Sequence, residues 1–140
     1  MRMVFTDAEV AYLREQPIGR LATVSPDGIV QNNPVSFHLD AELGVIDIGG
    51  HSMGVSKKFR NVERGSNRVA FVVDELISVE RQQVRGIEIR GVAEAMRDQI
   101  PYLPGLSGEL LRVHPRLIFS WSVNPGTDGV QRRVVAEPPA

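Results

Sequence analysis

"IGRLATVSPDGIVQNNPVSFHL", residues 18–39, is the stretch that indicates the fold. Two runs of apolar residues alternating with small and polar ones flank "SPDGI", in which Pro26-Asp27-Gly28 is typical of a tight turn. The stretch therefore predicts a β-hairpin whose second strand covers residues 30–39. Pro34 is unusual inside that strand because proline has no N–H to donate to a neighbouring strand. It indicates an edge, a bulge, or a face where a ligand replaces a neighbour.

The segments on either side of the hairpin predict a mainly β domain. "TDAEVAYLREQ", residues 6–16, predicts a helix because Thr6 and Glu9 fit a capping box. Strands are expected at 45–50, 67–76, 84–96, 116–123 and 130–135, with a loop at 97–109 that contains two prolines and two glycines. About six or seven antiparallel strands with short flanking helices predict a small barrel or sandwich, a single domain over residues 1–140.

Composition narrows the function classes. The 16 Lys and Arg residues nearly balance the 17 Asp and Glu residues, which argues against a nucleic-acid partner. Cysteine is absent, which excludes disulfides and thiolate metal sites. Charges interrupt the N-terminal segment, and no apolar stretch approaches the ~20 residues of a membrane span. We therefore expect no signal peptide, no membrane association and a cytoplasmic location.

"GGHSMGVSKKFRN", residues 49–61, is the strongest candidate for a binding site. A helix from about Val55 would place Val55, Phe59 and Val62 on one face, packed against the barrel. Lys57 and Lys58 lie in its first turn, where a positive charge interacts unfavourably with the helix dipole. Their presence there therefore needs an explanation.

Bound phosphate would supply that explanation. The N-terminus of a helix favours an anion, and the preceding glycines let the backbone approach it, so Gly49 or Gly50 should have positive φ or lie beside the anion. The alternative is a solvated basic face with Ser52 or Ser56 as a simple helix cap.

The remaining chemistry-bearing residues give weaker signals. The three histidines, His38, His51 and His114, lack the spacing of a metal site, so we expect no metal. His51 lies within the suspected anion loop and is the histidine most favoured to contact a ligand. No G-x-S-x-G motif supports a serine hydrolase. Trp121, taken alone, is typical of a core residue.

Four segments, taken in their order along the chain, resemble a known protein superfamily. "IGRLATVSPDGIVQNNPVSF", "IDIGGHSMGVSKKFRNVERGSNRVAFVVDE", "GIEIRGVAEA" and "HPRLIFSWSV" together resemble the pyridoxamine 5′-phosphate oxidase-like split β-barrel superfamily. Within it, the chain looks like the branch of oxidoreductases that depend on the deazaflavin coenzyme F420. The resemblance extends from about residue 6 to residue 135, and Lys58 and Asn61 match the family's Lys and Asn.

The resemblance implies a homodimer with a cofactor in each groove between subunits. Residues 49–52 and 56–58 would hold the phosphate, the ring system would pack on the strand "NPVSF", and the partner's late strands would bring Trp121 to the site. The cofactor-binding residues that it implies are Asn33, Pro34, Val35, Ser36, Gly49, Gly50, His51, Ser52, Ser56, Lys57, Lys58, Asn61 and Trp121. Many relatives carry an arginine where this chain has Ser56, which leaves FMN open as the alternative cofactor.

The activity that follows from the resemblance is an oxidoreductase. Reduced F420 would transfer a hydride to an electron-poor double bond of a small organic substrate, with no essential side-chain catalyst. Solvent, His51 or His38 would supply the proton. Two alternatives remain: an FMN-dependent oxidase or reductase, and a non-enzymatic protein that binds a cofactor or a tetrapyrrole.

Overall fold

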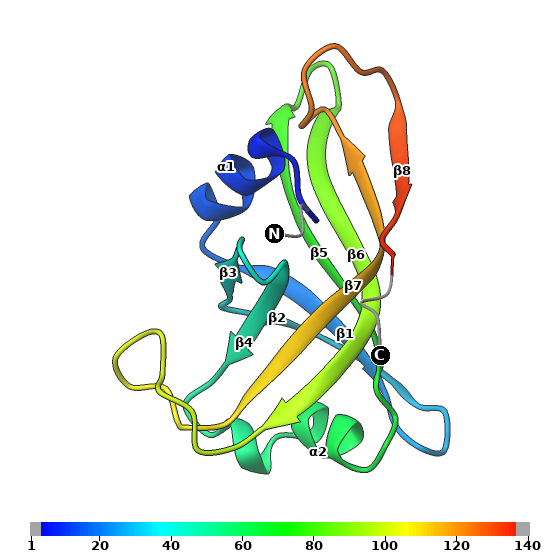
Figure 1. Cartoon of the computed structure of the whole chain (residues 1–140). Coiled ribbons are helices and arrows are strands. Elements are labelled where there is room, and N and C mark those ends of the chain that lie inside the picture. The colour runs from blue at the N-terminus through cyan, green and yellow to red at the C-terminus, as the bar shows by residue number, and fades with distance from the viewer. Residues whose placement is uncertain (1–3, 137–140) are drawn as a thin grey trace.

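The structure is a computed structural model that describes residues 4–136. One strongly curled antiparallel sheet forms a barrel, with α1 and α2 at opposite ends (Figure 1). In chain order the elements are α1 (Asp7–Glu15), β1 (Gly19–Val24), β2 (Val30–Val35), β3 (His38–Asp40), β4 (Val45–Gly49), a 3-10 turn (Met53–Val55), α2 (Lys57–Glu63), β5 (Arg68–Ser78), β6 (Gln83–Met96), β7 (Leu110–Trp121) and β8 (Val130–Val134).

The barrel is split between its two edge strands. The strand order is β2-β1-β5-β6-β7-β4-β3, and β8 pairs with the C-terminal part of β7. β2 and β3 lie at the two ends of this path although only Ser36 and Phe37 separate them in the chain. The chain thus crosses the split at Ser36, and the split-barrel fold expected from the sequence is confirmed.

Local sequence signals account for the first elements. The hydroxyl of Thr6 accepts from the Glu9 N–H at 3.1 Å, and the Glu9 carboxylate accepts from the Thr6 N–H at 3.0 Å, so the predicted capping box is present. β1 and β2 form the predicted hairpin from Gly19 paired with Val35 to Val24 paired with Val30. β2 is an edge strand, which is why Pro34 is tolerated there.

A single apolar core fills the barrel. Its fully buried side chains come from both helices and most strands and include Leu13, Leu21, Ile46, Ile48, Phe59, Phe71, Ile87, Ile89, Leu111 and Ile118. α2 closes one end of the barrel with Phe59 and Val62, which are 0% and 5% exposed. No helix within residues 4–136 is long and apolar enough to cross a membrane.

Three sequence-based boundaries were wrong. β7 begins at Leu110 rather than at residue 116, where a strand was expected to start. The strand expected over residues 30–39 is divided into β2 and β3, because the chain turns across the split where Phe37 packs edge-on against Phe71 at 5.1 Å. Val55 does not help to dock the helix. It lies in the 3-10 turn before α2 and is 67% exposed, because α2 begins only at Lys57.

Candidate functional site

A groove lies where the barrel is split, between the end of β2 and the chain that leaves β4. Its volume is about 340 Å³. It is lined by Pro34, Val35, Ser36, Gly49, Gly50, His51, Ser52, Met53, Ser56, Lys58 and Leu106. Most of the cofactor-binding residues expected from the sequence therefore line one groove, although three separate chain segments contribute them.

Lys58 supplies the positive charge of the groove. Burial lowers the pKa of its ammonium group, and no carboxylate within residues 4–136 forms an ion pair with it. Ser56 starts the helix that carries Lys58, since its hydroxyl accepts from the Phe59 N–H at 3.3 Å. A partly desolvated cation without a partner is suited to a ligand's anionic group.

The 97–109 loop (Figure 1, yellow) contributes Leu106 to the lining of this groove and binds the backbone of the glycine-containing segment. The hydroxyl of Tyr102 accepts from the Gly49 N–H at 2.8 Å. Ser107 Oγ accepts from the Met53 N–H at 3.1 Å, and the Glu109 carboxylate accepts from the Gly54 N–H at 3.1 Å. The loop thus occupies the Gly49 N–H, one of the backbone donors that the sequence-based hypothesis assigned to a phosphate.

Other backbone donors remain open. The N–H groups of Gly50, His51 and Ser52 have no protein acceptor among residues 4–136, and neither do those of Lys57 and Lys58 in the first turn of α2. Exposed N–H groups beside an unpaired ammonium are the donor set that an oxyanion requires. An anion would therefore contact the two ends of the 49–58 segment rather than its middle.

The glycines of this segment do not have the predicted backbone conformation. Neither Gly49 nor Gly50 has positive φ. Gly49 is the last residue of β4, and a Cβ atom there would lie 3.1 Å from Leu106 and 3.3 Å from Tyr102. At Gly50 the nearest atom, in Met53, would be 3.7 Å away, an ordinary contact. Close approach of the 97–109 loop therefore explains why residue 49 is a glycine. At position 50 the fold leaves room for a side chain.

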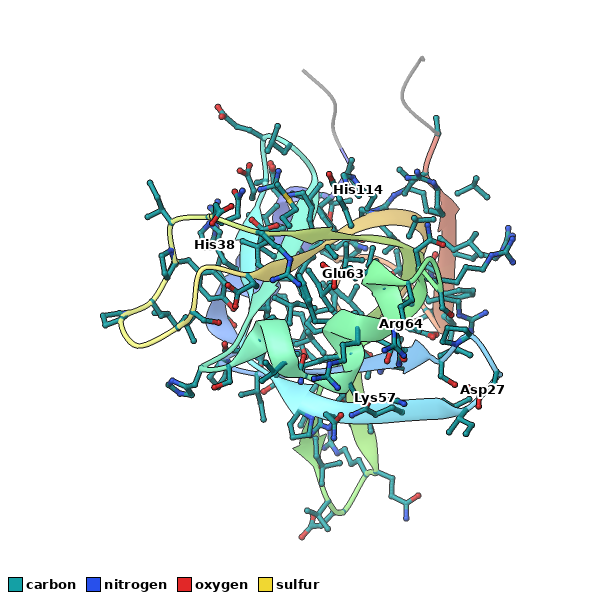
Figure 2. The ribbon with its side chains drawn as sticks, turned by 90° about the horizontal axis from the view of Figure 1, so that it is seen from below. Asp27, His38, Lys57, Glu63, Arg64 and His114 are labelled. Carbon is teal, nitrogen blue, oxygen red and sulfur yellow. The ribbon has the colours of Figure 1, made fainter. Side chains whose placement is uncertain are left out.

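Two of the expected residues on or beside α2 point away from the groove. Asn61 is 2% exposed, and its amide donates to Thr23 Oγ1 at 3.1 Å, so it anchors α2 to β1. Lys57 is exposed on the side of α2 that faces the β1–β2 turn, where Asp27 lies (Figure 2). Lys57 contributes to lowering the pKa of Asp27, after the larger effect of the hydrogen bond from Ser25. The position of Lys57 matches the sequence-based alternative of a solvated basic face, whereas the structural contact of Asn61 was not expected from the sequence.

The two other residues outside the groove lie on strands. Asn33 is next to Pro34 on β2 and accepts a hydrogen bond from Gln31 at 2.7 Å. Trp121 ends β7, whereas Leu110, the register partner of Gly49, begins it. Twelve residues of extended strand span roughly 36 Å, so Trp121 does not reach the groove of its own subunit.

The histidines have separate surroundings. His51 Nδ1 lies 2.9 Å from the Gly105 carbonyl oxygen, and the His38 ring stacks on Tyr102 with centroids 5.6 Å apart. His114 contacts Glu94 at 3.1 Å and lies on β7, which is two strands away from β3 and His38 in the sheet. His51 therefore lies at the groove, as the sequence indicated, and His38 packs against Tyr102 of the 97–109 loop.

Sequence reasoning missed the contribution of the 97–109 loop. Leu106 lines the groove, and Tyr102, Ser107 and Glu109 hold the segment that forms its floor. One signal was available, because a loop of about thirteen residues between two long strands is longer than most connections in compact domains and is often functional.

A second, larger hollow lies on the outer face of the sheet. Its volume is about 490 Å³, and it is lined by Ala22, Val24, Arg68, Val69, Ala70, Arg90, Gly91, Val92, Arg116 and Leu117. It lacks the backbone donors and turns of the groove. Arg90 is held by Glu88 at 3.0 Å and by the Phe119 ring. An open apolar face with arginines at its rim is more typical of a protein contact than of a small-molecule site.

Comparisons with known proteins agree with this geometry. The family model of pyridoxamine 5′-phosphate oxidase matches residues 5–104. The chain is 45% identical over 125 residues to a 5a,11a-dehydrotetracycline/5a,11a-dehydrooxytetracycline reductase of Streptomyces rimosus, covering 86% of this chain and 85% of the relative.

Solved structures support the fold. A conserved hypothetical protein of Mycobacterium tuberculosis is similar with a TM-score of 0.64 at 22% identity, covering 85% of this chain and 86% of that one. An F420 reductase is similar with a TM-score of 0.57 at 25% identity, covering 76% of this chain and 93% of that one. From the family match and the 45% identical relative together, the chain belongs to the pyridoxamine 5′-phosphate oxidase family of split-barrel oxidoreductases.

Proposed function

We propose that this protein is a reductase that uses the deazaflavin coenzyme F420 to reduce an electron-poor double bond in a small fused-ring substrate. The observation that carries the proposal is Lys58, a partly buried ammonium group with no ion-pair partner among residues 4–136, which faces a groove lined by residues of the barrel split. The 45% identical relative, which reduces dehydrotetracyclines, supports both the reaction class and a fused-ring dehydro compound as substrate.

The residues of the groove fit a phosphate-bearing ring system. Lys58 and the open N–H groups of residues 50–52 would bind the phosphate. Pro34 and Val35 offer an apolar surface on the edge strand, against which a flat ring can pack. When bound, the coenzyme supplies the hydride. The protein's share is to bind and orient the ring and to shield one ring face from water.

FMN is the second candidate cofactor because it presents the same chemistry, a phosphate and a flat tricycle, to the groove. The family resemblance expects an arginine at the position of Ser56. With serine there, the phosphate site has one positive charge fewer, which leaves the choice between F420 and FMN open. The deciding measurement is a fluorescence and absorbance titration of the purified protein with F420, FMN and haemin in parallel.

We expect F420 to bind most tightly, and we expect reduced F420 to be oxidised in the presence of a fused-ring dehydro compound. Preference for FMN would replace the cofactor assignment and keep the groove. Tight haemin binding without turnover of either reduced cofactor would favour the non-enzymatic alternative.

We also propose a homodimer in which each groove lies at the subunit interface. Two observations support it: the apolar outer face around Ala70 and Leu117, and the position of Trp121, which only a second subunit can bring to a groove. Sedimentation should give a dimer at micromolar concentration. A monomer that still binds the cofactor would contradict this proposal without affecting the assignment of the groove.

A further inference from the structure

Tyr102 joins the two sides of the groove through its hydroxyl group. The oxygen accepts from the Gly49 N–H at 2.8 Å and lies 3.2 Å from Ser36 Oγ. Gly49 ends β4 and Ser36 follows β2, and both line the groove. The Tyr102 ring stacks on His38 with a 24° angle between the planes. One side chain from the 97–109 loop is therefore held by both sides of the barrel split.

The bond from Gly49 leaves the hydroxyl hydrogen of Tyr102 free for the contact with Ser36, in which the geometry allows either hydroxyl to donate. A backbone N–H can only donate, so the Tyr102 oxygen is the acceptor there and its own hydrogen remains available. A phenol is a stronger acid than an aliphatic alcohol and hence the better donor of the two. If Tyr102 donates to Ser36 Oγ, the hydrogen of Ser36 remains for a molecule in the groove.

We propose that Tyr102 is a positioning residue that makes Ser36 a hydrogen-bond donor to an acceptor oxygen of the bound ring system. The inference rests on the proposed function, in which the ring lies against Pro34 and Val35, next to Ser36. A hydroxyl whose hydrogen is directed into the groove favours a ligand that presents a carbonyl oxygen at this point over one that presents an N–H group. Tyr102 and Ser36 together would then contribute to the choice of ligand and to the depth at which its ring is seated.

The test variant is Tyr102→Phe, which removes the hydroxyl and keeps the ring that stacks on His38. Tyr12→Phe is the matched control. The Tyr12 phenol is also partly buried and donates to the Arg85 carbonyl at 3.3 Å, but it lies on α1 at the other end of the barrel. We expect Tyr102→Phe to weaken binding of F420 roughly threefold to tenfold, the usual effect of one neutral hydrogen bond, and Tyr12→Phe to leave it unchanged.

Two further readouts separate positioning from support of the fold. The absorption band of the bound ring should shift between wild type and Tyr102→Phe, because a hydrogen bond to a ring oxygen changes its electronic environment. Ser36→Ala should lose as much affinity as Tyr102→Phe, and the double variant should lose no more than either single one, since the two hydroxyls act as one unit.

Different outcomes overturn different claims. Unchanged affinity of Tyr102→Phe, with or without a lower melting temperature, overturns the positioning role. Fully additive losses in the double variant overturn the coupling to Ser36. Wild-type protein that binds neither F420 nor FMN overturns the proposed function, and this inference with it.

Discussion

Two charged groups at opposite ends of the barrel, one buried and one partly buried, have contrasting surroundings. Glu9 on α1 is 0% exposed, and its carboxylate accepts from the Arg133 guanidinium, the Asn124 amide and the Thr6 N–H. Lys58 on α2 is partly buried, yet no carboxylate in the described part of the chain pairs with it. Both groups lose hydration on folding, but only Glu9 recovers the lost contacts within the protein.

The difference distinguishes a structural charge from a functional one. The Glu9 contacts join elements from the two ends of the chain, because Arg133 lies on β8 and also donates to the Val4 carbonyl at 2.9 Å. Burial acts to raise the pKa of Glu9, but hydrogen bonds from Arg133, Asn124 and Thr6 outweigh it and lower that pKa. At Lys58 burial acts alone, so the protein carries an unbalanced desolvation penalty that an anionic ligand would offset.

Removing the paired charge should give the largest effect. Glu9→Ala leaves the Arg133 guanidinium without its carboxylate and the first turn of α1 without its capping partner. We expect a loss of about 3 kcal/mol in the free energy of unfolding, at the low end for a buried pair because Arg133 stays 37% exposed. Urea denaturation measures it. Glu63→Ala, which breaks the exposed pair with Arg97, is the control and should change stability by less than about 1 kcal/mol.

Removing the unpaired charge should affect binding and spare the fold. Lys58→Met deletes a charge-assisted contact worth about 1.5–3 kcal/mol and should weaken cofactor binding by roughly tenfold to a hundredfold. Stability without ligand should stay equal or rise, because the desolvated ammonium is gone.

The exposed neighbour provides the control for that variant. Lys57→Met removes the same charge from the adjacent residue, on the side of α2 that faces Asp27 (Figure 2). It should leave the cofactor dissociation constant nearly unchanged. Equal losses from Lys57→Met and Lys58→Met would show a general electrostatic attraction rather than a contact, and would return Lys58 to the solvated-face interpretation.

Acid should weaken the Glu9 contacts in a reversible way and by less than the deletion does. Because the folded pKa of Glu9 is lowered, its contribution to stability is complete above the unfolded value of about 4.3 and is lost as the pH falls through the folded pKa. We expect the melting temperature to fall below about pH 4.5. In Glu9→Gln, which cannot titrate, this part of the fall should be missing, and an identical acid profile would assign it to other carboxylates.

Sequence signals that act over a few residues predicted the structure well. The Thr6 and Glu9 capping box, the turn at Gly28 and the packing of Phe59 and Val62 each depend on neighbours within about one turn, and each is present. The family's motif order then predicted the split barrel, and the groove contains Pro34 to Ser36 together with Lys58, as the motif implied.

Contacts between distant segments were not predictable in the same way. The side of α2 that Asn61 occupies depends on Thr23, which lies thirty-eight residues earlier and meets it only after the barrel has closed. The Tyr102 contact with Gly49 spans fifty-three residues and comes from a loop without periodicity. A glycine required by such a contact looks in sequence like a glycine required by a ligand, so the sequence alone could not separate these two reasons for Gly49.

The smallest predicted effects distinguish these two reasons for a glycine at positions 49 and 50 of the groove. Gly49→Ala places a Cβ atom against Leu106 and Tyr102 and should destabilise the protein by about 1 kcal/mol through overcrowding. Gly50 has ordinary φ and room for a methyl group, so Gly50→Ala should raise stability by ~0.4–1 kcal/mol through the unfolded chain. Thermal unfolding of the two variants side by side measures both changes. Cofactor titration then separates an effect on stability from an effect on binding. If the ligand closely approaches the open Gly50 N–H, Gly50→Ala should be more stable but should bind the cofactor more weakly. Unchanged affinity in that variant would mean that the phosphate lies at the Lys58 end of the segment, away from the glycines.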